Sequence, residues 1–182
     1  GFIKGRHFKV RGSFKMQKTN LERLDIVFDK KATHWVVHVP LDQYLYGVMT
    51  SEVPVSWPLE SLKAQAVASR TYFLFKKKQR RDQHFDVRAS IMDQVFKMQS
   101  DKHHNILKAV KETHGMILTS DSDHQVFPAY FHSDCGGHTS SEKSVWRQPS
   151  SLNQGVVDPY CKTASKNNWS HIIDRHHLMA LL

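Results

Sequence analysis

Hydrophobic and polar residues alternate in three short runs within the first 39 residues. The runs are residues 8–12, 24–28 and 34–39, and polar residues that favour turns separate them. Alternation with a period of two is typical of strands, which place successive side chains on opposite faces. The pattern therefore predicts a β-rich segment over residues 1–39.

After Pro40 the hydrophobic period changes to that of a helix. Apolar residues recur at i, i+3, i+4, i+7 and i+8, which places them on one face: Leu41, Tyr44, Leu45, Val48 and Met49. A second helix is predicted from about residue 57 to residue 78, with Pro58 suited to its first turn. We expect these two helices to pack together at the centre of the fold.

The rest of the chain gives weaker patterns. Residues 105–113 predict a short helix that Gly115 ends, and residues 116–118 and 125–132 predict further short strands that face each other across a polar turn. A C-terminal helix is predicted over about residues 168–182. The resulting class is α+β, with one domain over residues 1–182. The chain begins at Gly1 without a signal peptide, and we interpret it as a fragment of a longer secreted precursor.

The charge of the chain narrows the classes of partner. Lys and Arg number 26 against 17 acidic residues, a net charge of +9, and 13 histidines add more charge at acidic pH. Such a surface favours anionic polymers, although the basic run at residues 76–81 is equally typical of a solvated helix end. Signatures of nucleic-acid-binding domains are missing from the sequence, and its apolar runs are too short to span a membrane.

Glu52 is the first candidate for chemistry. It continues the apolar stripe of the first helix, at i+11 from Leu41. Burial of a carboxyl group disfavours its charged form, and a protonated carboxylic acid is what the cleavage of a glycosidic bond requires. The alternative is a helix that has already frayed before Pro54, which would leave Glu52 in water. Spacing alone favours this second interpretation.

Two cations form a row on the second helix. Lys63 and Arg70 are seven residues apart and share a face beside the inner stripe. Cations in this position either orient a polar or anionic substrate or lie with their aliphatic stems along the core.

Reactive side chains also gather around a diglycine at residues 132–139. The spacing His132, Cys135, His138, with Cys161 as a fourth ligand, is compatible with tetrahedral zinc. A disulfide between Cys135 and Cys161 fits equally well in an oxidising compartment. A cysteine nucleophile is the weakest alternative, because no known nucleophile signature surrounds Cys135.

A series of motifs follows the chain at residues 44–48, 51–54, 57–58, 62–72, 93–96, 113–118, 130–133 and 136–139, followed by Trp146. Together and in this order, these motifs resemble the SpoIID (stage II sporulation protein D) and LytB-like family. The resemblance covers roughly residues 8–174, and a set of motifs over this length is very specific. Phe96 and Ser69 depart from the family pattern, which has Tyr and Ala there.

The resemblance implies a lytic enzyme that cuts peptidoglycan glycan strands, with Glu52 as its catalytic acid and base. The bond is the β-1,4 link between N-acetylmuramic acid and N-acetylglucosamine, cleaved by a lytic transglycosylase or a lysozyme-like mechanism. Asp93 and Asp134 are candidates for a second carboxylate. The residues that the resemblance places along the substrate groove are Lys63, Arg70, Gln94, His132 and Ser133.

LytB-like relatives are described as enhancers of a separate amidase, so the alternative function is a wall-binding module without catalysis. Either function places the chain outside the cytoplasm. An oxidising location favours the Cys135–Cys161 disulfide over zinc. His132 is also expected to face the groove, which leaves it poorly free to bind a metal. We therefore expect no cofactor, and peptidoglycan rather than nucleic acid as the partner.

Overall fold

The computed structural model describes residues 7–16, 19–28, 33–99, 101–147, 153–163, 170, 172–174 and 179. The chain divides into two compact units, Gly1–Tyr130 and Phe131–Leu182. The predicted α+β class is confirmed. The single domain over residues 1–182 stays a prediction.

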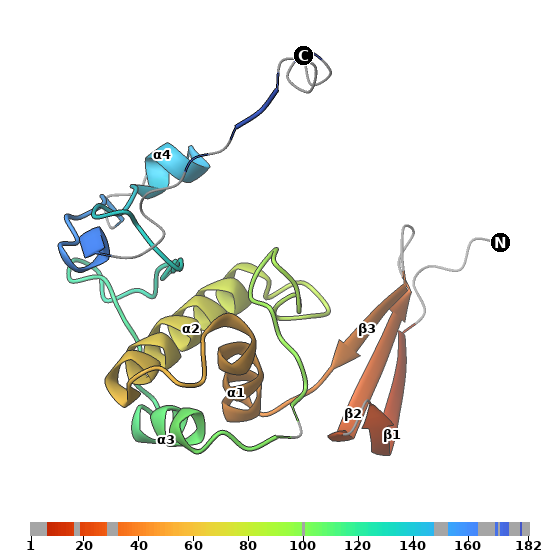
Figure 1. The fold of residues 1–182 in the computed structure, drawn as a ribbon. Helices are drawn as coiled ribbons and strands as arrows, with labels where there is room; N and C mark the ends of the chain where they lie inside the picture. Colours follow the sequence, from red (N-terminus) through yellow and green to blue (C-terminus); the bar gives the residue numbers. More distant parts are fainter. Residues whose placement is uncertain are drawn as a thin grey trace. The chain divides into compact units, whose positions relative to one another are not determined.

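The first unit begins with an antiparallel sheet of three strands in the order β1-β2-β3 (Figure 1). The strands are β1 (His7–Met16), β2 (Thr19–Phe28) and β3 (Thr33–Val37). Val10 pairs with Leu24 and Ile26 pairs with Trp35, and the register of the first pair of strands shifts between Arg11 and Phe14. The prediction of a β-rich N-terminal segment is therefore confirmed.

Three helices follow, and each contacts the other two (Figure 1). They are α1 (Leu41–Glu52), α2 (Leu59–Gln79) and α3 (His104–Glu112), close to the predicted bounds. Their interface is the hydrophobic core of this unit. Its buried residues are Tyr44, Leu45, Tyr46, Val48, Met49, Val53, Leu62, Ala66, Ile106, Ala109 and Val110.

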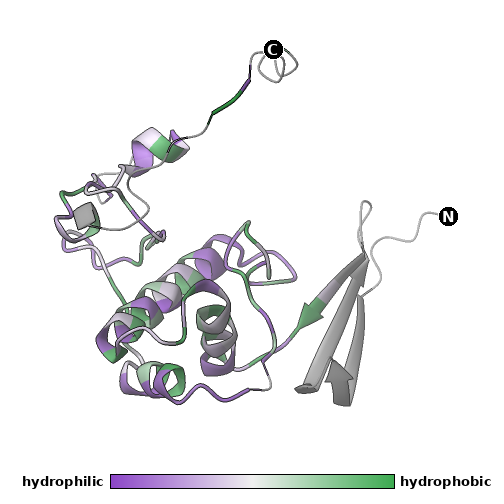
Figure 2. Ribbon diagram, viewed as in Figure 1, coloured by the Kyte–Doolittle hydropathy of each residue, from purple (hydrophilic) through white to green (hydrophobic). Residues whose placement is uncertain are grey.

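The ends and faces of the helices follow from the local sequence. α1 stops at Glu52 because Val53 precedes Pro54, and a residue before proline is forced out of the helical region; Val53 is extended, with φ −131° and ψ 150°. α3 is amphipathic, with hydrophilic and hydrophobic residues on different sides (Figure 2). Its apolar side is buried against α1 and α2.

The strands predicted at residues 116–118 and 125–132 are wrong, because the described chain is irregular there. Side chains of α2 bind the backbone of residues 116–118 in place of a neighbouring strand. Arg70 Nη1 donates to the Met116 carbonyl at 3.0 Å, and Leu118 N donates to Thr71 Oγ1 at 2.9 Å. The apolar run that suggested a strand stays exposed, with Met116 at 55% and Leu118 at 42%.

The second unit is built around the diglycine turn. Gly136 and Gly137 have φ of 66° and 103°, values that side chains disfavour. The turn pairs with a later segment: Thr139 N donates to the Val156 carbonyl, and Asp158 N donates to the Gly137 carbonyl, both at 2.9 Å. The unit also contains α4 (Glu142–Trp146) and a 3-10 helix, η1 (Tyr160–Thr163), which the sequence analysis did not predict.

The C-terminal helix predicted over residues 168–182 falls largely outside the described residues. Of its described residues, 170 and 172–174 are not helical, whereas Met179 is helical. Within the described part of the chain, no helix is long and apolar enough to cross a membrane.

Candidate active site around Glu52

Glu52 is the last residue of α1, and its side chain is half-buried. Its Oε1 accepts a hydrogen bond from the backbone N–H of Val95 at 2.7 Å. No other hydrogen bond to this carboxylate comes from the described residues, so Oε2 is the oxygen left for a ligand. Within the described residues, Oε1 of Glu52 thus has a hydrogen-bond donor and Oε2 has none, and the catalytic role of Glu52 stays a prediction.

The segment that supplies this N–H lies along α1. Tyr44 OH donates to Gln94 Oε1 at 3.0 Å, and the rings of Tyr44 and Phe96 stack with centroids 5.4 Å apart. Gly47 permits the approach, because a Cβ there would lie 2.5 Å from the Lys97 carbonyl oxygen. Residues 94–97 therefore contact α1 at several points in addition to the hydrogen bond between Val95 and Glu52.

Asp93 immediately precedes this segment and is fully buried at its side chain. Arg80 binds both carboxylate oxygens, with Nη2 at 3.0 Å from Oδ1. The Arg88 N–H donates to Oδ2 at 2.7 Å, and Lys76 Nζ lies 3.3 Å from Oδ1. Both oxygens are thus occupied, which removes Asp93 from the candidates for a second catalytic carboxylate.

Gln94 was predicted to line the substrate groove, and its burial corrects that prediction. The residue is 1% exposed, and its oxygen is bound to Tyr44. Its Nε2 has no hydrogen-bond partner among the described residues. Burial raises the pKa of Tyr44 far above its usual range, so this phenol is a permanent donor. Gln94 therefore fastens the segment to α1 instead of touching a polymer.

Lys63 is partly exposed, but its charge is already balanced. Its Nζ lies 2.8 Å from Glu60 Oε1 and 2.8 Å from Glu112 Oε2. The hydrogen bonds to Glu112 and then Glu60 raise the pKa of Lys63 above its usual value. A substrate anion at Lys63 would compete with both carboxylates. The predicted role of Lys63 in substrate binding stays a prediction.

Arg70 was predicted to hold a substrate carboxylate, and the structure gives it a different role. The residue is 2% exposed, and its guanidinium donates to the carbonyls of Met116 at 3.0 Å and Val110 at 3.4 Å. These carbonyls belong to the last turn of α3 and to the chain just beyond it. A buried cation at the end of a helix stabilises that end, so Arg70 joins α2 to α3.

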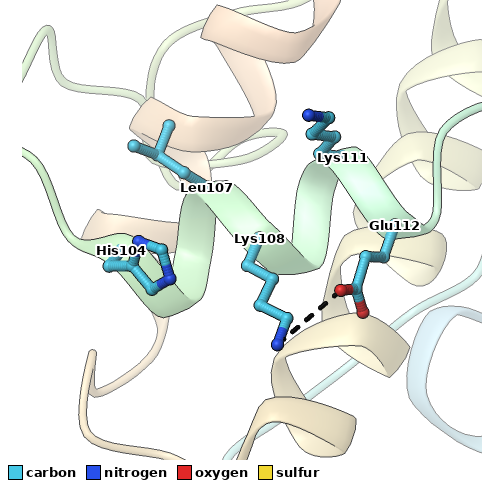
Figure 3. A pocket seen from close by; sticks show the side chains of 5 residues that line it. All are labelled: His104, Leu107, Lys108, Lys111 and Glu112. Atoms are coloured by element: carbon cyan, nitrogen blue, oxygen red, sulfur yellow. Dashed lines mark ion pairs between the residues drawn. The ribbon is translucent and has the colours of Figure 1, made fainter.

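A pocket of about 550 Å³ lies on the exposed side of α3 (Figure 3). Among the described residues that line the pocket, the carboxylate is that of Glu112, which is paired with Lys63 and, at 3.8 Å, with Lys108. None of these lining residues is a predicted site residue. We assign the pocket no role in catalysis, because Glu112 is paired with two lysines.

The remaining predicted residues belong to the second unit and are described within it. His132 and Ser133 are exposed, and both stay predictions as groove residues. Asp134 Oδ1 accepts from the Gly136 N–H at 2.8 Å. Asp134 thus supports the diglycine turn, a common use of aspartate next to glycine.

The two cysteines meet at a third residue that the sequence analysis missed. Cys135 Sγ lies 3.3 Å and Cys161 Sγ lies 3.2 Å from Asp158 Oδ2. The structure shows no disulfide between these two cysteines, so the predicted disulfide stays a prediction. The spacing Asp158-x-x-Cys161 is the signal that was overlooked.

Asp158 changes the set of residues that could hold a metal. The ligand atoms of Cys135, Asp158 and Cys161 lie within 4.8 Å of one another. Thiolates and a carboxylate suit zinc. His132 and His138, the other two residues of the predicted zinc set, are not members of this cluster within the described chain.

Comparison with known proteins gives a consistent family. Residues 29–120 match the sequence profile of SpoIID, described as "Stage II sporulation protein". This match covers the three helices, Glu52 and the Asp93–Val95 segment. The chain is similar to the "Stage II sporulation protein D" of Bacillus amyloliquefaciens, with 31% identity over 75% of this chain and 44% of that protein.

Two further relatives are similar over different shares of the chain. An uncharacterized protein of Brachyspira hyodysenteriae is 32% identical over 76% of this chain and 37% of its own length. The "Amidase enhancer" of Bacillus subtilis is 36% identical over 56% of this chain and 13% of its own length. The chain therefore spans less than half the length of the relatives that it matches.

Proposed function

The chain belongs to the SpoIID family of stage II sporulation proteins, and from this premise we propose that it cleaves peptidoglycan glycan strands with Glu52 as acid and base. The bond is the β-1,4 link between N-acetylmuramic acid and N-acetylglucosamine. Peptidoglycan lies outside the cytoplasm, so the proposal includes an extracytoplasmic location. It also includes the activity of the whole protein, of which this chain covers a part.

The observation that carries the proposal is the asymmetric environment of the Glu52 carboxylate. Oε1 is fixed by the Val95 N–H at 2.7 Å, and the side chain is half-buried at the end of α1. A fixed carboxyl group with one open oxygen is suited to deliver a proton in a defined direction. The net charge of +9 supports an anionic polymer as the substrate.

In the proposed mechanism Glu52 first protonates the glycosidic oxygen as the bond to C1 of the muramic acid breaks. The resulting carboxylate then removes a proton, either from the C6 hydroxyl of the same sugar or from water. Attack of the C6 oxygen on C1 gives a 1,6-anhydro end, and attack of water gives a reducing end. In both cases Glu52 regains its proton.

The state of Asp93 favours the anhydro product. Arg80, Lys76 and the Arg88 N–H bind the carboxylate oxygens of Asp93, so this residue is not available as a nucleophile or second base. A retaining or inverting hydrolase ordinarily requires two carboxyl groups. A single acid and base suffices for the transglycosylase route, because the substrate supplies its own nucleophile.

The test is mass spectrometry of the muropeptides that wild type and Glu52→Gln release from purified peptidoglycan. Glutamine keeps the shape and loses the proton, so we expect turnover to fall by at least about a hundredfold. An anhydro end is lighter than a reducing end by one water, so the spectrum also identifies the route. Glu60→Gln is the matched control, since Glu60 is an exposed glutamate on α2.

Glu60→Gln should cleave like wild type. Near-normal cleavage by Glu52→Gln would move the chemistry to another carboxyl group and reject the proposal. A pulldown of both proteins with insoluble peptidoglycan checks that Glu52→Gln still binds, so that lost turnover is a loss of chemistry.

The second candidate function is a wall-binding module that enhances a separate amidase, and the similarity to an amidase enhancer favours it. This function uses the basic surface and does not require Glu52. It predicts that wild type and Glu52→Gln release no glycan fragments and increase the rate of an added amidase equally. The same two proteins therefore separate the two functions.

A further inference from the structure

Asp93 is a buried carboxylate that the proposed chemistry does not use. Its side chain is fully buried, and three positive groups or donors surround it: Arg80, Lys76 and the Arg88 N–H. Burial alone raises the pKa of Asp93, but the hydrogen bond from Arg80 and the other contacts outweigh it and hold the pKa below its usual range. The group is therefore an ion-paired carboxylate bound to the C-terminal end of α2.

Three consecutive residues connect this anion to Glu52. Asp93 is bound to Arg80 at the C-terminal end of α2, Gln94 is bound to Tyr44 in α1, and the Val95 N–H is bound to Glu52. Asp93 and Val95 are two residues apart, which is at most about 7 Å of chain. A shift of Asp93 is therefore passed to the Val95 N–H over a short stretch.

Val95 fixes the orientation of the Glu52 carboxylate. Its N–H occupies Oε1, so Oε2 is the oxygen that can carry a proton to a substrate. Displacement of Val95 would let the carboxyl group rotate, and the proton would lose its defined direction. A misplacement of about 1 Å in an active site costs roughly a hundredfold in rate.

We propose that Asp93 is a positioning residue, whose contacts with Arg80 and Lys76 hold the Val95 N–H against Glu52. This inference rests on the proposed function, since it gives Glu52 the role of acid. It replaces the expectation that Asp93 supplies a second catalytic carboxylate. It also connects the end of α2 to an active site at the end of α1.

The test is Asp93→Asn, which keeps the size of the side chain and removes its charge. On soluble glycan strands kcat should fall roughly 10- to 100-fold, while KM stays within about twofold because Asp93 does not face the substrate. In ¹H–¹⁵N spectra the Val95 amide should move and lose its protection from exchange. Glu52→Gln should move the same amide.

Asp86→Asn is the matched control from the same loop. Asp86 also pairs with a lysine of α2, with Oδ2 at 3.3 Å from Lys77 Nζ, but this pair is about half exposed. It should leave kcat and the Val95 amide unchanged. Should Asp93→Asn fail to fold, Arg80→Lys gives the readout, because lysine keeps the charge and loses the two-pronged contact. Arg80→Lys should show a smaller fall in kcat and a smaller movement of the Val95 amide than Asp93→Asn.

The outcomes separate this inference from the proposed function. Cleavage by Glu52→Gln would reject the proposed function and the inference with it. Inactive Glu52→Gln together with wild-type kcat in Asp93→Asn would reject the inference alone. A loss of kcat with an unmoved Val95 amide would also overturn it, and so would a lower melting temperature with unchanged kcat per folded molecule.

Discussion

Gly47 shows how a single residue determines the position of the candidate acid. It lies in the middle of α1, where glycine ordinarily destabilises a helix by about 1 kcal/mol relative to alanine. A Cβ at this position would lie 2.5 Å from the Lys97 carbonyl oxygen and 2.5 Å from the Phe96 ring. The close approach of residues 94–97 to α1 therefore depends on the absence of a side chain.

We predict that Gly47→Ala destabilises the protein by about 1–3 kcal/mol, despite the better helix propensity of alanine. The clash is with backbone as well as with a ring, so the segment must move, and kcat should fall because the Val95 N–H moves with it. Urea unfolding and turnover on soluble glycan measure the two effects. Gly115→Ala is the control: its added Cβ meets nothing within 4 Å, but its φ of 76° is strained.

Gly115→Ala should cost about 1 kcal/mol through strain alone and leave kcat unchanged. A Gly47→Ala protein that is more stable than wild type would show that helix propensity outweighs the clash. In that case the segment at residues 94–97 would be adaptable, and its hold on Glu52 would be weaker than the structure indicates.

The apolar stripe of α1 and the family motifs made Glu52 a candidate, and its catalytic role stays a prediction. The sequence did not reveal the surroundings of Glu52, for a physical reason. The donor to its carboxylate is a backbone N–H, which leaves no signature in the side chains. Gln94 and Arg70 lie in the matching motifs, but a motif does not tell whether a polar residue is exposed or, like these two, buried.

At the level of elements, α2 connects the parts of the first unit. Arg70 binds carbonyls at the end of α3, Thr71 binds the backbone of Leu118, and Arg80 binds Asp93. The helices themselves were predictable because their apolar residues recur with a helical period. These polar contacts were not predictable, since they join residues more than ten positions apart.

The first two of these contacts explain why the strand predicted at residues 116–118 is wrong. An apolar run such as residues 116–118 indicates a strand only if a neighbouring strand pairs with it. Here two polar side chains of α2 bind the backbone instead, and the apolar side chains remain exposed. The local pattern does not contain this information, because the competing partners lie 46 and 47 residues away.

At this scale we predict that Arg70→Ala acts on stability. Truncation leaves two carbonyls near the end of α3 without their charged donor and opens a cavity, at a cost of about 3 kcal/mol. Turnover per folded molecule should change little. Lys63→Met is the comparison, because its ion pairs are partly exposed and contribute little to stability.

Thermal unfolding followed by circular dichroism measures both variants, and turnover is normalised to the folded fraction. A stable Arg70→Ala protein that no longer cleaves or binds glycan would restore the role in substrate binding that the motif implied. Burial of Arg70 at 2% exposure is the reason that we expect the opposite.

At the scale of the whole molecule, the division into two units separates two kinds of chemistry. The first unit contains Glu52 and its positioning contacts, and the second contains both cysteines. The sequence predicted that Cys135 and Cys161 meet, as a disulfide or a zinc site requires. It did not predict Asp158, which lies 3.3 Å and 3.2 Å from the two sulfur atoms.

The pairing between the diglycine turn and residues 156–158 brings these groups together. The hydrogen bond with the Cys135 backbone lowers the pKa of Cys161. The hydrogen bonds with Asp158 and with the Cys135 side chain raise this pKa, and the result is a pKa of about 11. The thiol is therefore protonated at neutral pH and slow to react with alkylating reagents. Oxidation removes this proton altogether, and an oxidising compartment favours it.

We predict that the protein isolated from an oxidising compartment contains the Cys135–Cys161 disulfide. The two sulfur atoms lie within 4.8 Å, so bond formation requires an approach of less than about 3 Å. Closing this loop contributes roughly 3 kcal/mol in the chain-entropy model. Intact mass under denaturing conditions should rise by about 2 Da on reduction, and elemental analysis should find no zinc.

Asp158→Asn distinguishes the alternatives, because this variant should keep the disulfide but would lose a metal that Asp158 helps to bind. An unchanged mass on reduction, with one zinc per chain that Asp158→Asn removes, would replace the disulfide by a metal site.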